Sequence, residues 1–287
     1  MEFTTFSADG LRFVVAVEGE GPDVVLLHGF PDTPHSWAPL QRSLVDAGYR
    51  TIVPWLRGYH PDTIVADRPY DPETIARDAL GLLDAVGSSS AVLAGHDWGA
   101  LVAYGAAALA PERVPAFVTS GIAHPSLMKR NLALLWSGRH FLVHKLPWAS
   151  RWSRRDDFAY FDRLYRRWAP TWSGPDRDRA LADAKHALAD EATLNGALGY
   201  YRDLPARMEG PVAELPAVPG LIVGGTEVHV QREAFRATAD LLPPPSRALI
   251  VPGGHWPHRE DHDTVERELL AFLAQVTGVK MTAVPAD

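Results

Sequence analysis

The chain has 287 residues, 46% of them hydrophobic, which suits one large α/β domain or a core with one inserted subdomain. Its net charge of −7 argues against a nucleic-acid partner or an anionic membrane surface, and the absence of cysteine excludes disulfides, thiolate metal ligands and a cysteine nucleophile. The first residues lack a secretory pattern and the longest apolar stretch, residues 100–110, is too short for a membrane span. We therefore expect a soluble, cytoplasmic protein.

The first third alternates strand and helix patterns. Short apolar runs predict strands at residues 12–18, 23–27, 51–54, 91–94 and 114–119. Helical spacing predicts helices at residues 39–47 and 71–86 and directly after Gly99. Strands that alternate with helices indicate an α/β fold, a mostly parallel sheet with helices on both faces.

From about His124 the pattern changes to helical spacing rich in Trp, Arg and Leu, without a clear strand. Strand patterns return at residues 220–224 and 248–251, a helix is predicted at 264–276, and residues 281–287 read as a loose tail. We therefore predict a core formed by residues 1–124 and 206–287, interrupted by a helical cap at 125–205.

The strongest chemical feature is the sequence Gly95-His96-Asp97-Trp98-Gly99, which joins an apolar strand to a small-residue helix. This is the setting of a nucleophile elbow, with aspartate where serine is usual. The glycines permit a tight turn that lifts the Asp97 side chain above the sheet, and the helix directs its first amides at a developing anion. The alternative is that Asp97 only caps the helix.

Two loops at strand ends complete the pattern. His255 follows the last apolar strand on a glycine-rich loop, at the sheet edge where catalytic groups of α/β proteins collect, and is a candidate base. His28-Gly29-Phe30-Pro31 follows the strand at 23–27 and forms a tight turn that can aim a backbone N–H at the reacting centre.

Together with Leu56-Arg57-Gly58-Tyr59, these motifs resemble the epoxide hydrolases of the α/β-hydrolase superfamily, the branch with an aspartate nucleophile that is related to haloalkane dehalogenases. The resemblance covers most of residues 21–125 and the last third, and thins to short segments in the insertion.

The resemblance implies that Asp97 attacks the epoxide carbon and that His255 activates the water that hydrolyses the resulting ester. It places the oxyanion between the backbone amides of Phe30 and Trp98. Two cap tyrosines would hold the epoxide oxygen: Tyr201 in Leu198-Gly199-Tyr200-Tyr201-Arg202, and Tyr160 with Tyr165 as its competitor. We expect Trp98, Pro31 and Tyr165 to line the site of a small hydrophobic substrate, with no metal or cofactor, in a monomer or homodimer.

The acid that supports the histidine is the main departure from the family pattern. Val228 stands where the family has an aspartate, and the alternative position falls near Ser120. Glu227, one residue before Val228, is our candidate for the third member of the triad.

Two other functions stay open. A haloalkane dehalogenase would use the same Asp and His with an indole N–H, such as that of Trp98, for the halide. A binding protein or non-hydrolytic catalyst would explain the missing acid at Val228.

Overall fold

A central sheet organises the chain in this computed structural model, which describes residues 1–127, 138–227 and 232–279. Eight strands lie in the order β1-β2-β4-β3-β5-β6-β7-β8; the pairs β1–β2 and β2–β4 are antiparallel and the others parallel. The strands are β1 (Thr4–Ala8), β2 (Leu11–Glu18), β3 (Asp23–Leu27), β4 (Arg50–Pro54), β5 (Ala91–His96), β6 (Phe117–Ser120), β7 (Gly220–Gly225) and β8 (Arg247–Val251). The predicted α/β class is confirmed.

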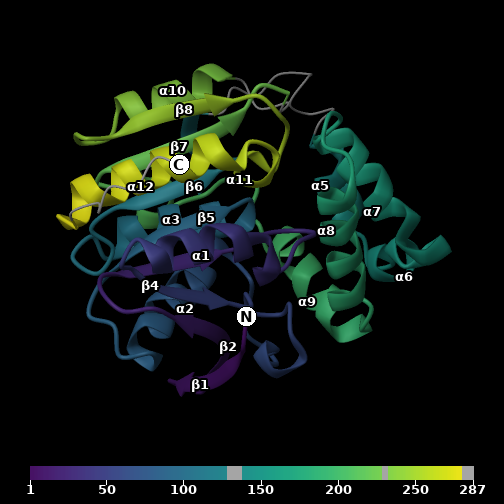
Figure 1. Cartoon of the computed structure of the whole chain (residues 1–287). Coiled ribbons are helices and arrows are strands. Elements are labelled where there is room, and N and C mark those ends of the chain that lie inside the picture. Colours follow the sequence, from purple (N-terminus) through teal and green to yellow (C-terminus); the bar gives the residue numbers. More distant parts are fainter. Residues whose placement is uncertain (128–137, 228–231, 280–287) are drawn as a thin grey trace.

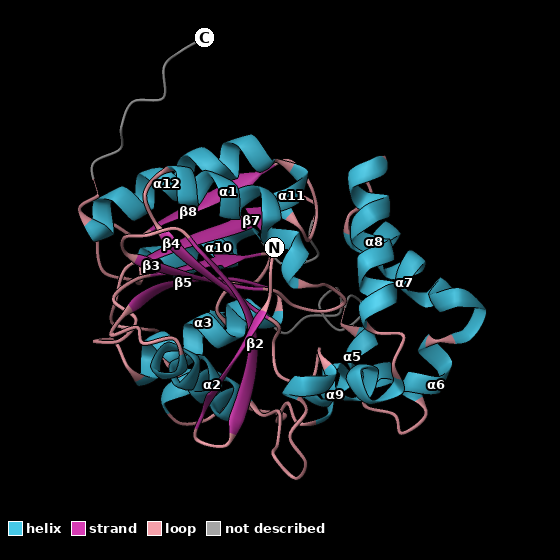
Figure 2. Cartoon of the chain, turned by 60° about the horizontal axis from the view of Figure 1, so that its bottom comes forward, coloured by secondary structure: helices cyan, strands magenta, loops and turns pink. Residues whose placement is uncertain are grey.

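Helices cover both faces of this sheet (Figure 2). One face carries α1 (Ala38–Asp46) and α12 (His262–Thr277), and the other carries α2 (Pro72–Ala85), α3 (Trp98–Leu109) and α10 (Arg232–Asp240). The shorter elements of the core are η1 (Pro34–Trp37), η2 (Pro61–Thr63), η3 (Pro125–Leu127), η4 (Pro211–Ala213) and α11 (Pro257–Glu260).

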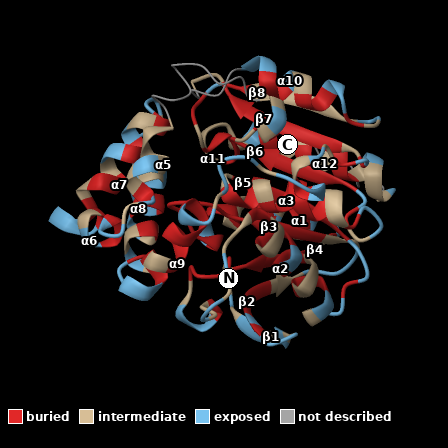
Figure 3. Cartoon of the chain, turned by 180° about the vertical axis from the view of Figure 1, so that it is seen from behind, coloured by how far each residue is buried: buried red, intermediate tan, exposed pale blue. Residues whose placement is uncertain are grey.

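The buried strands explain this layering, because side chains alternate between the two faces of a sheet. In β3, Val24 and Leu26 pack with α1 and α12, while Val25 and Leu27 pack with α2 and α3. A parallel strand that is covered on both faces therefore reads as a continuous apolar run. Figure 3 shows the central strands as buried and the outward helix faces as exposed.

Between β6 and β7 the described residues form helices and no strand. These helices are α5 (Arg139–His144), α6 (Ala149–Ser153), α7 (Arg155–Trp168), α8 (Pro175–Ala187) and α9 (Glu191–Arg202). They gather on one side of the sheet, beside the carboxyl ends of its parallel strands (Figure 1). The boundaries of the cap at residues 125 and 205 stay a prediction.

In the described ranges no helix has the length and apolar character needed to cross a membrane. The predicted tail at 281–287 lies outside the described residues.

Candidate active site

Asp97 occupies the turn between β5 and α3, as the motif predicts. Its backbone has φ 52° and ψ −114°, a conformation that costs an L-residue energy and that recurs at functional sites. The carbonyl of Asp97 accepts the amide N–H of Ala100 at 3.0 Å, so the turn leads directly into the helix. The sequence therefore holds the Asp97 carboxylate at the carboxyl edge of the sheet.

Three glycines permit this turn because the backbone packs too closely for a side chain. A Cβ at Gly95 would collide with the Gly99 carbonyl, and one at Gly99 with the Leu27 carbonyl. A Cβ at Gly29 would collide with the Cβ of Asp97 and lie 2.6 Å from its Oδ1. The loop that follows β3 and the nucleophile elbow therefore pack closely around Asp97.

Each oxygen of the Asp97 carboxylate has a separate partner. Oδ1 accepts the backbone N–H of Phe30 at 2.8 Å, and Oδ2 lies 3.2 Å from Nε2 of His255. Burial alone would raise the pKa of Asp97, but His255, His96 and the Phe30 amide outweigh it and lower the pKa to about 2. The carboxylate is therefore ionised near neutral pH.

Hydrogen bonds hold the loop that carries His255 against both the cap and the sheet. The His255 amide donates to the Trp168 carbonyl of α7 at 2.8 Å, and its own carbonyl accepts Nε2–H of His96 at 2.8 Å. Burial lowers the pKa of His255 below its ordinary 6.5, and the hydrogen bond to Asp97 offsets this only in part. His255 is therefore neutral near pH 7, as a base must be.

The proposed oxyanion donors converge on this carboxylate from two elements. Phe30 already donates its amide to Asp97. Trp98 is the first residue of α3, where an amide has no acceptor within its own helix. The role of the Trp98 amide as the second oxyanion donor stays a prediction.

Tyr201 of α9 packs against Phe30 and Trp98, the two residues beside the nucleophile. Its ring centroid is 4.9 Å from that of Trp98 and 5.4 Å from that of Phe30. Burial raises the pKa of Tyr201 well above 10, and the negative charge of Asp97 raises it further. Tyr201 therefore keeps its proton and is suited to donate it.

Tyr160 of α7 lies one step further from the nucleophile. Its hydroxyl is 2.8 Å from Nε2 of His144, and the His144 ring lies 4.3 Å from the ring of Tyr201. The structure thus brings Tyr160 and Tyr201 to the same buried imidazole, that of His144, which the sequence analysis did not single out.

Tyr165 uses its hydroxyl in a contact between α7 and the core, and its place in the substrate site stays a prediction. Its fully buried hydroxyl donates to the Pro31 carbonyl at 3.0 Å and also lies 3.4 Å from the Ala180 carbonyl. Its polar group fastens α7 to the loop that carries Phe30 and Pro31, because a buried hydroxyl takes the nearest carbonyl.

Glu227, the predicted triad acid, lies against Thr171 and not beside His255. Its carboxylate accepts the hydroxyl of Thr171 at 2.8 Å, at the surface between β7 and the cap. Among the described residues, Asp97 is the one acidic side chain within 4 Å of His255. The turn after β7 points Glu227 to the surface, and Val228 lies outside the described residues.

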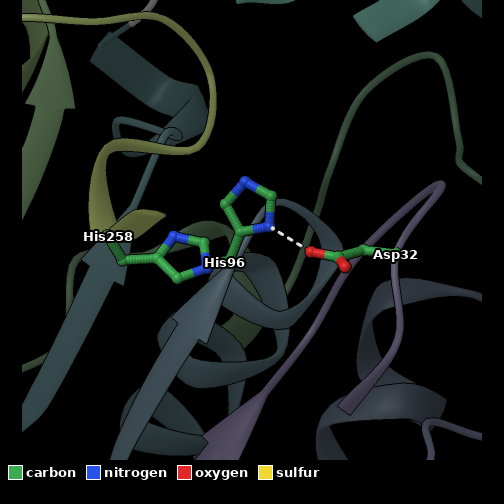
Figure 4. A group of neighbouring side chains, drawn as sticks. All are labelled: Asp32, His96 and His258. Carbon is green, nitrogen blue, oxygen red and sulfur yellow. Dashed lines mark ion pairs between the residues drawn. The ribbon is translucent and has the colours of Figure 1, made fainter. Parts of the chain in front are cut away.

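Sequence reasoning missed a buried polar group beneath the histidine loop, formed by Asp32, His96 and His258 (Figure 4). Asp32 accepts the Thr33 amide at 2.8 Å and lies 3.2 Å from the indole nitrogen of Trp256. Its Oδ2 is 3.5 Å from Nδ1 of His96. The signal was present, since Asp32 follows the Phe30-Pro31 turn and His96 belongs to the elbow motif.

The group has the residue types of a metal site, with donor atoms within 4.8 Å of one another. However, the nitrogens of His258 face the hydroxyls of Ser36 at 3.0 Å and Ser120 at 3.3 Å. Binding a cation would break these hydrogen bonds as well as those of Asp32. The arrangement fits a polar network that supports the His255 loop better than a metal centre.

The comparisons with known proteins agree with this fold. The alpha/beta hydrolase fold family matches residues 22–138. A Bacillus subtilis protein of the AB hydrolase superfamily, YfhM, is 30% identical over 93% of this chain and 96% of its own length. Epoxide hydrolase A of Mycobacterium tuberculosis is 30% identical over 94% of this chain and 95% of its own.

A Caballeronia sordidicola epoxide hydrolase is 35% identical over 62% of this chain, and the match spans 48% of that relative's length. In structure, a candidate epoxide hydrolase from Pseudomonas aeruginosa superposes with a TM-score of 0.82 at 23% identity, over 97% of each chain. The chain belongs to the α/β-hydrolase superfamily, and its predicted resemblance to epoxide hydrolases is confirmed.

Proposed function

We propose that the protein hydrolyses epoxides to vicinal diols through a covalent ester on Asp97. One observation carries the proposal: an ionised aspartate at a strained turn, with an amide on one oxygen and a neutral histidine on the other. The names of the relatives as epoxide hydrolases support the substrate class.

In the first step, Oδ2 or Oδ1 of Asp97 attacks a ring carbon, the bond between that carbon and the ring oxygen breaks, and an alkyl ester forms. The departing alkoxide takes a proton from the Tyr201 hydroxyl. Tyr160 acts indirectly, because its hydroxyl is hydrogen-bonded to His144. Aromatic rings around Asp97 favour a small apolar substrate.

In the second step, His255 removes a proton from water, and the hydroxide attacks the ester carbonyl of Asp97. The amides of Phe30 and Trp98 hold the oxyanion until the ester bond breaks. When the ester bond breaks, the leaving alkoxide takes the proton of the carboxylic acid formed on Asp97. The diol leaves, Asp97 is again a carboxylate, and the proton on His255 restores the Tyr201 phenol through solvent. All atoms balance as epoxide plus water.

Incubation with styrene oxide tests the proposal. We expect a diol from the native chain and none from Asp97→Asn, because an amide is a poor nucleophile. A diol formed equally by both proteins would overturn it.

Dehalogenation is the second candidate, and one observation favours it. The indole N–H of Trp98 is buried at the start of α3 beside Tyr201, where a halide-binding donor would stand. Release of bromide from bromoalkanes, with styrene oxide left intact, would select this function.

Capture without turnover is the third candidate, because no described carboxylate other than that of Asp97 lies within 4 Å of a His255 ring nitrogen. Intact mass measurement after epoxide treatment separates the cases: a persistent adduct without diol indicates capture, and neither adduct nor diol indicates a binding protein.

A further inference from the structure

Glu260, the last residue of α11, binds the loop of the proposed base on both sides of the histidine. Its Oε2 accepts the amide N–H of Gly254 at 2.7 Å, and its Oε1 accepts that of Trp256 at 2.9 Å. One carboxylate therefore holds the residue before His255 and the residue after it. Hydrogen bonds from a backbone N–H to an ionised carboxylate are about twice as strong as those between neutral groups.

The glycines of this loop make room for the carboxylate. Gly253 has φ 121°, and a Cβ on it would lie 2.9 Å from both the Cβ and the Oε2 of Glu260. A Cβ on Gly254 would collide with the Trp168 carbonyl of the cap. The loop therefore packs closely against Glu260 and against the cap, and neither contact tolerates a larger residue.

The environment of Glu260 shows that the loop amides stabilise its charged form. The side chain is half-buried, and burial raises its pKa above the ordinary 4.5. The amides of Gly254 and Trp256 act in the opposite direction, while the charge of Glu227 raises the pKa further. A partly desolvated carboxylate thus lies near a second acid, and its two bonds to the loop offset part of the cost.

These contacts fix the backbone from which the imidazole projects. The amide of His255 itself donates to the Trp168 carbonyl at 2.8 Å, so three consecutive amides, those of residues 254–256, each have an acceptor. Nε2 of His255 lies 3.2 Å from Oδ2 of Asp97. A general base must lie within hydrogen-bond reach of the proton that it removes, so a small shift of this loop would misplace it.

We propose that Glu260 is a positioning residue for His255, which holds the imidazole where it can activate water for attack on the Asp97 ester. The inference rests on the proposed function and adds to it a residue that serves the second step. Alkylation is expected to be independent of Glu260, because Tyr201 lies on α9 and the Asp97 carboxylate is also held by the Phe30 amide.

Glu260→Gln tests this role, because glutamine keeps the size of the side chain but has only one acceptor oxygen. In a single turnover of styrene oxide we expect hydrolysis of the ester to slow at least about tenfold, part of the contribution of a general base. Rapid-quench measurement of alkylation should change less than about twofold. Glu266→Gln, which removes the partner of His262 on α12, is the matched control and should keep both rates.

A purely structural role would give a different result. If Glu260→Gln slows alkylation as much as hydrolysis, the carboxylate only maintains the fold and the inference is wrong. When hydrolysis alone slows, kcat and KM fall together and kcat/KM, which reports the steps up to the ester, is retained.

Hydrogen exchange measures the loop without substrate. In Glu260→Gln we expect the amides of residues 254–256 to exchange at least about tenfold faster than in the native chain, the size of a lost bond to a charged acceptor. Peptides from α12 should exchange alike in both proteins. Glu260→Asp, whose carboxylate is one methylene shorter, is a second variant for the same measurement, and full protection of the loop in both variants would overturn the inference.

The two measurements separate this inference from the proposed function. If the native chain forms the diol and Glu260→Gln hydrolyses the ester equally fast, the role of Glu260 is wrong and the epoxide hydrolase stands. If the native chain forms no diol, the proposed function fails, and faster exchange of the loop in Glu260→Gln would still support the positioning of His255 by Glu260.

Discussion

At the residue scale, the two cap tyrosines are not equivalent. Tyr201 contacts the Phe30 and Trp98 rings, whereas the Tyr160 hydroxyl is occupied by His144. We expect Tyr201→Phe to slow alkylation of Asp97 by about 10²- to 10⁴-fold, the usual loss for a general acid. Tyr160→Phe, the matched control on α7, should cost less than about tenfold because it acts through His144.

Rapid-quench measurement of the ester on Asp97 gives the alkylation rate of each variant. An equal loss in both would show that Tyr160 also touches the leaving oxygen, as the family resemblance suggested.

The support of His255 is the other question at this scale. No carboxylate of the described residues lies at Nδ1 of His255. The contact with Asp97 then favours the tautomer with the proton on Nε2, which is the wrong one for a base. We predict that Val228→Asp accelerates ester hydrolysis at least about tenfold, since removing such an acid costs about 10⁴-fold in serine proteases. Single-turnover diol release measures this step.

Glu227→Gln is the control for that variant. Because the Glu227 carboxylate bonds Thr171, its loss should change the hydrolysis rate less than about twofold, within the effect of an ordinary surface change. A collapse of hydrolysis in Glu227→Gln would restore Glu227 as the triad acid.

At the element scale, the elbow depends on the packing of the β3 loop against the β5–α3 turn. Gly29→Ala would force its Cβ against Asp97. We expect at least about a 100-fold loss of kcat/KM, because small displacements of reacting groups cost that much.

Gly81→Ala in α2 is the control, because its Cβ would come no closer than 3.7 Å to the Phe13 ring. It should keep activity and raise the free energy of unfolding by about 0.5–1 kcal/mol. Normal activity in Gly29→Ala would contradict the packing account of the elbow.

Local signals predicted some elements better than others. The helix α2 begins within one residue of its predicted start, and Asp71 caps it by accepting the amides of Glu73 and Thr74. The exposed edge strand β1 and the short helix α10 were missed, since neither has a long apolar period. The strand expected from Val114 begins at Phe117.

The site residues that could be predicted were likewise those with a local sequence signal. Asp97, His255 and Phe30 could be predicted because a strand end fixes the position of the residue after it. The partners of Tyr160, Tyr165 and Glu227 depend on how the insertion packs on the core, and no local pattern encodes that packing.

At the scale of the whole molecule, the insertion and the core are joined by a few buried polar contacts close to the nucleophile. The hydroxyl of Tyr165 binds the Pro31 carbonyl, and the Trp168 carbonyl binds the His255 amide. The insertion therefore helps to position both loops that meet Asp97.

Tyr165→Phe should lower the free energy of unfolding by about 1–2 kcal/mol, because it leaves the buried Pro31 carbonyl without its donor. Urea denaturation measures the change. Tyr70→Phe is a control, since the Tyr70 hydroxyl forms no hydrogen bond within the described part of the chain. An equal loss in both would show that the Pro31 contact adds nothing.

The central claim is that an oxygen of Asp97 enters the product. A single turnover of styrene oxide in water enriched in ¹⁸O, with enzyme in excess, tests it most directly. The account predicts an unlabelled diol and one ¹⁸O in the peptide that contains Asp97. A labelled diol with an unlabelled Asp97 peptide would show direct attack by water and contradict the account.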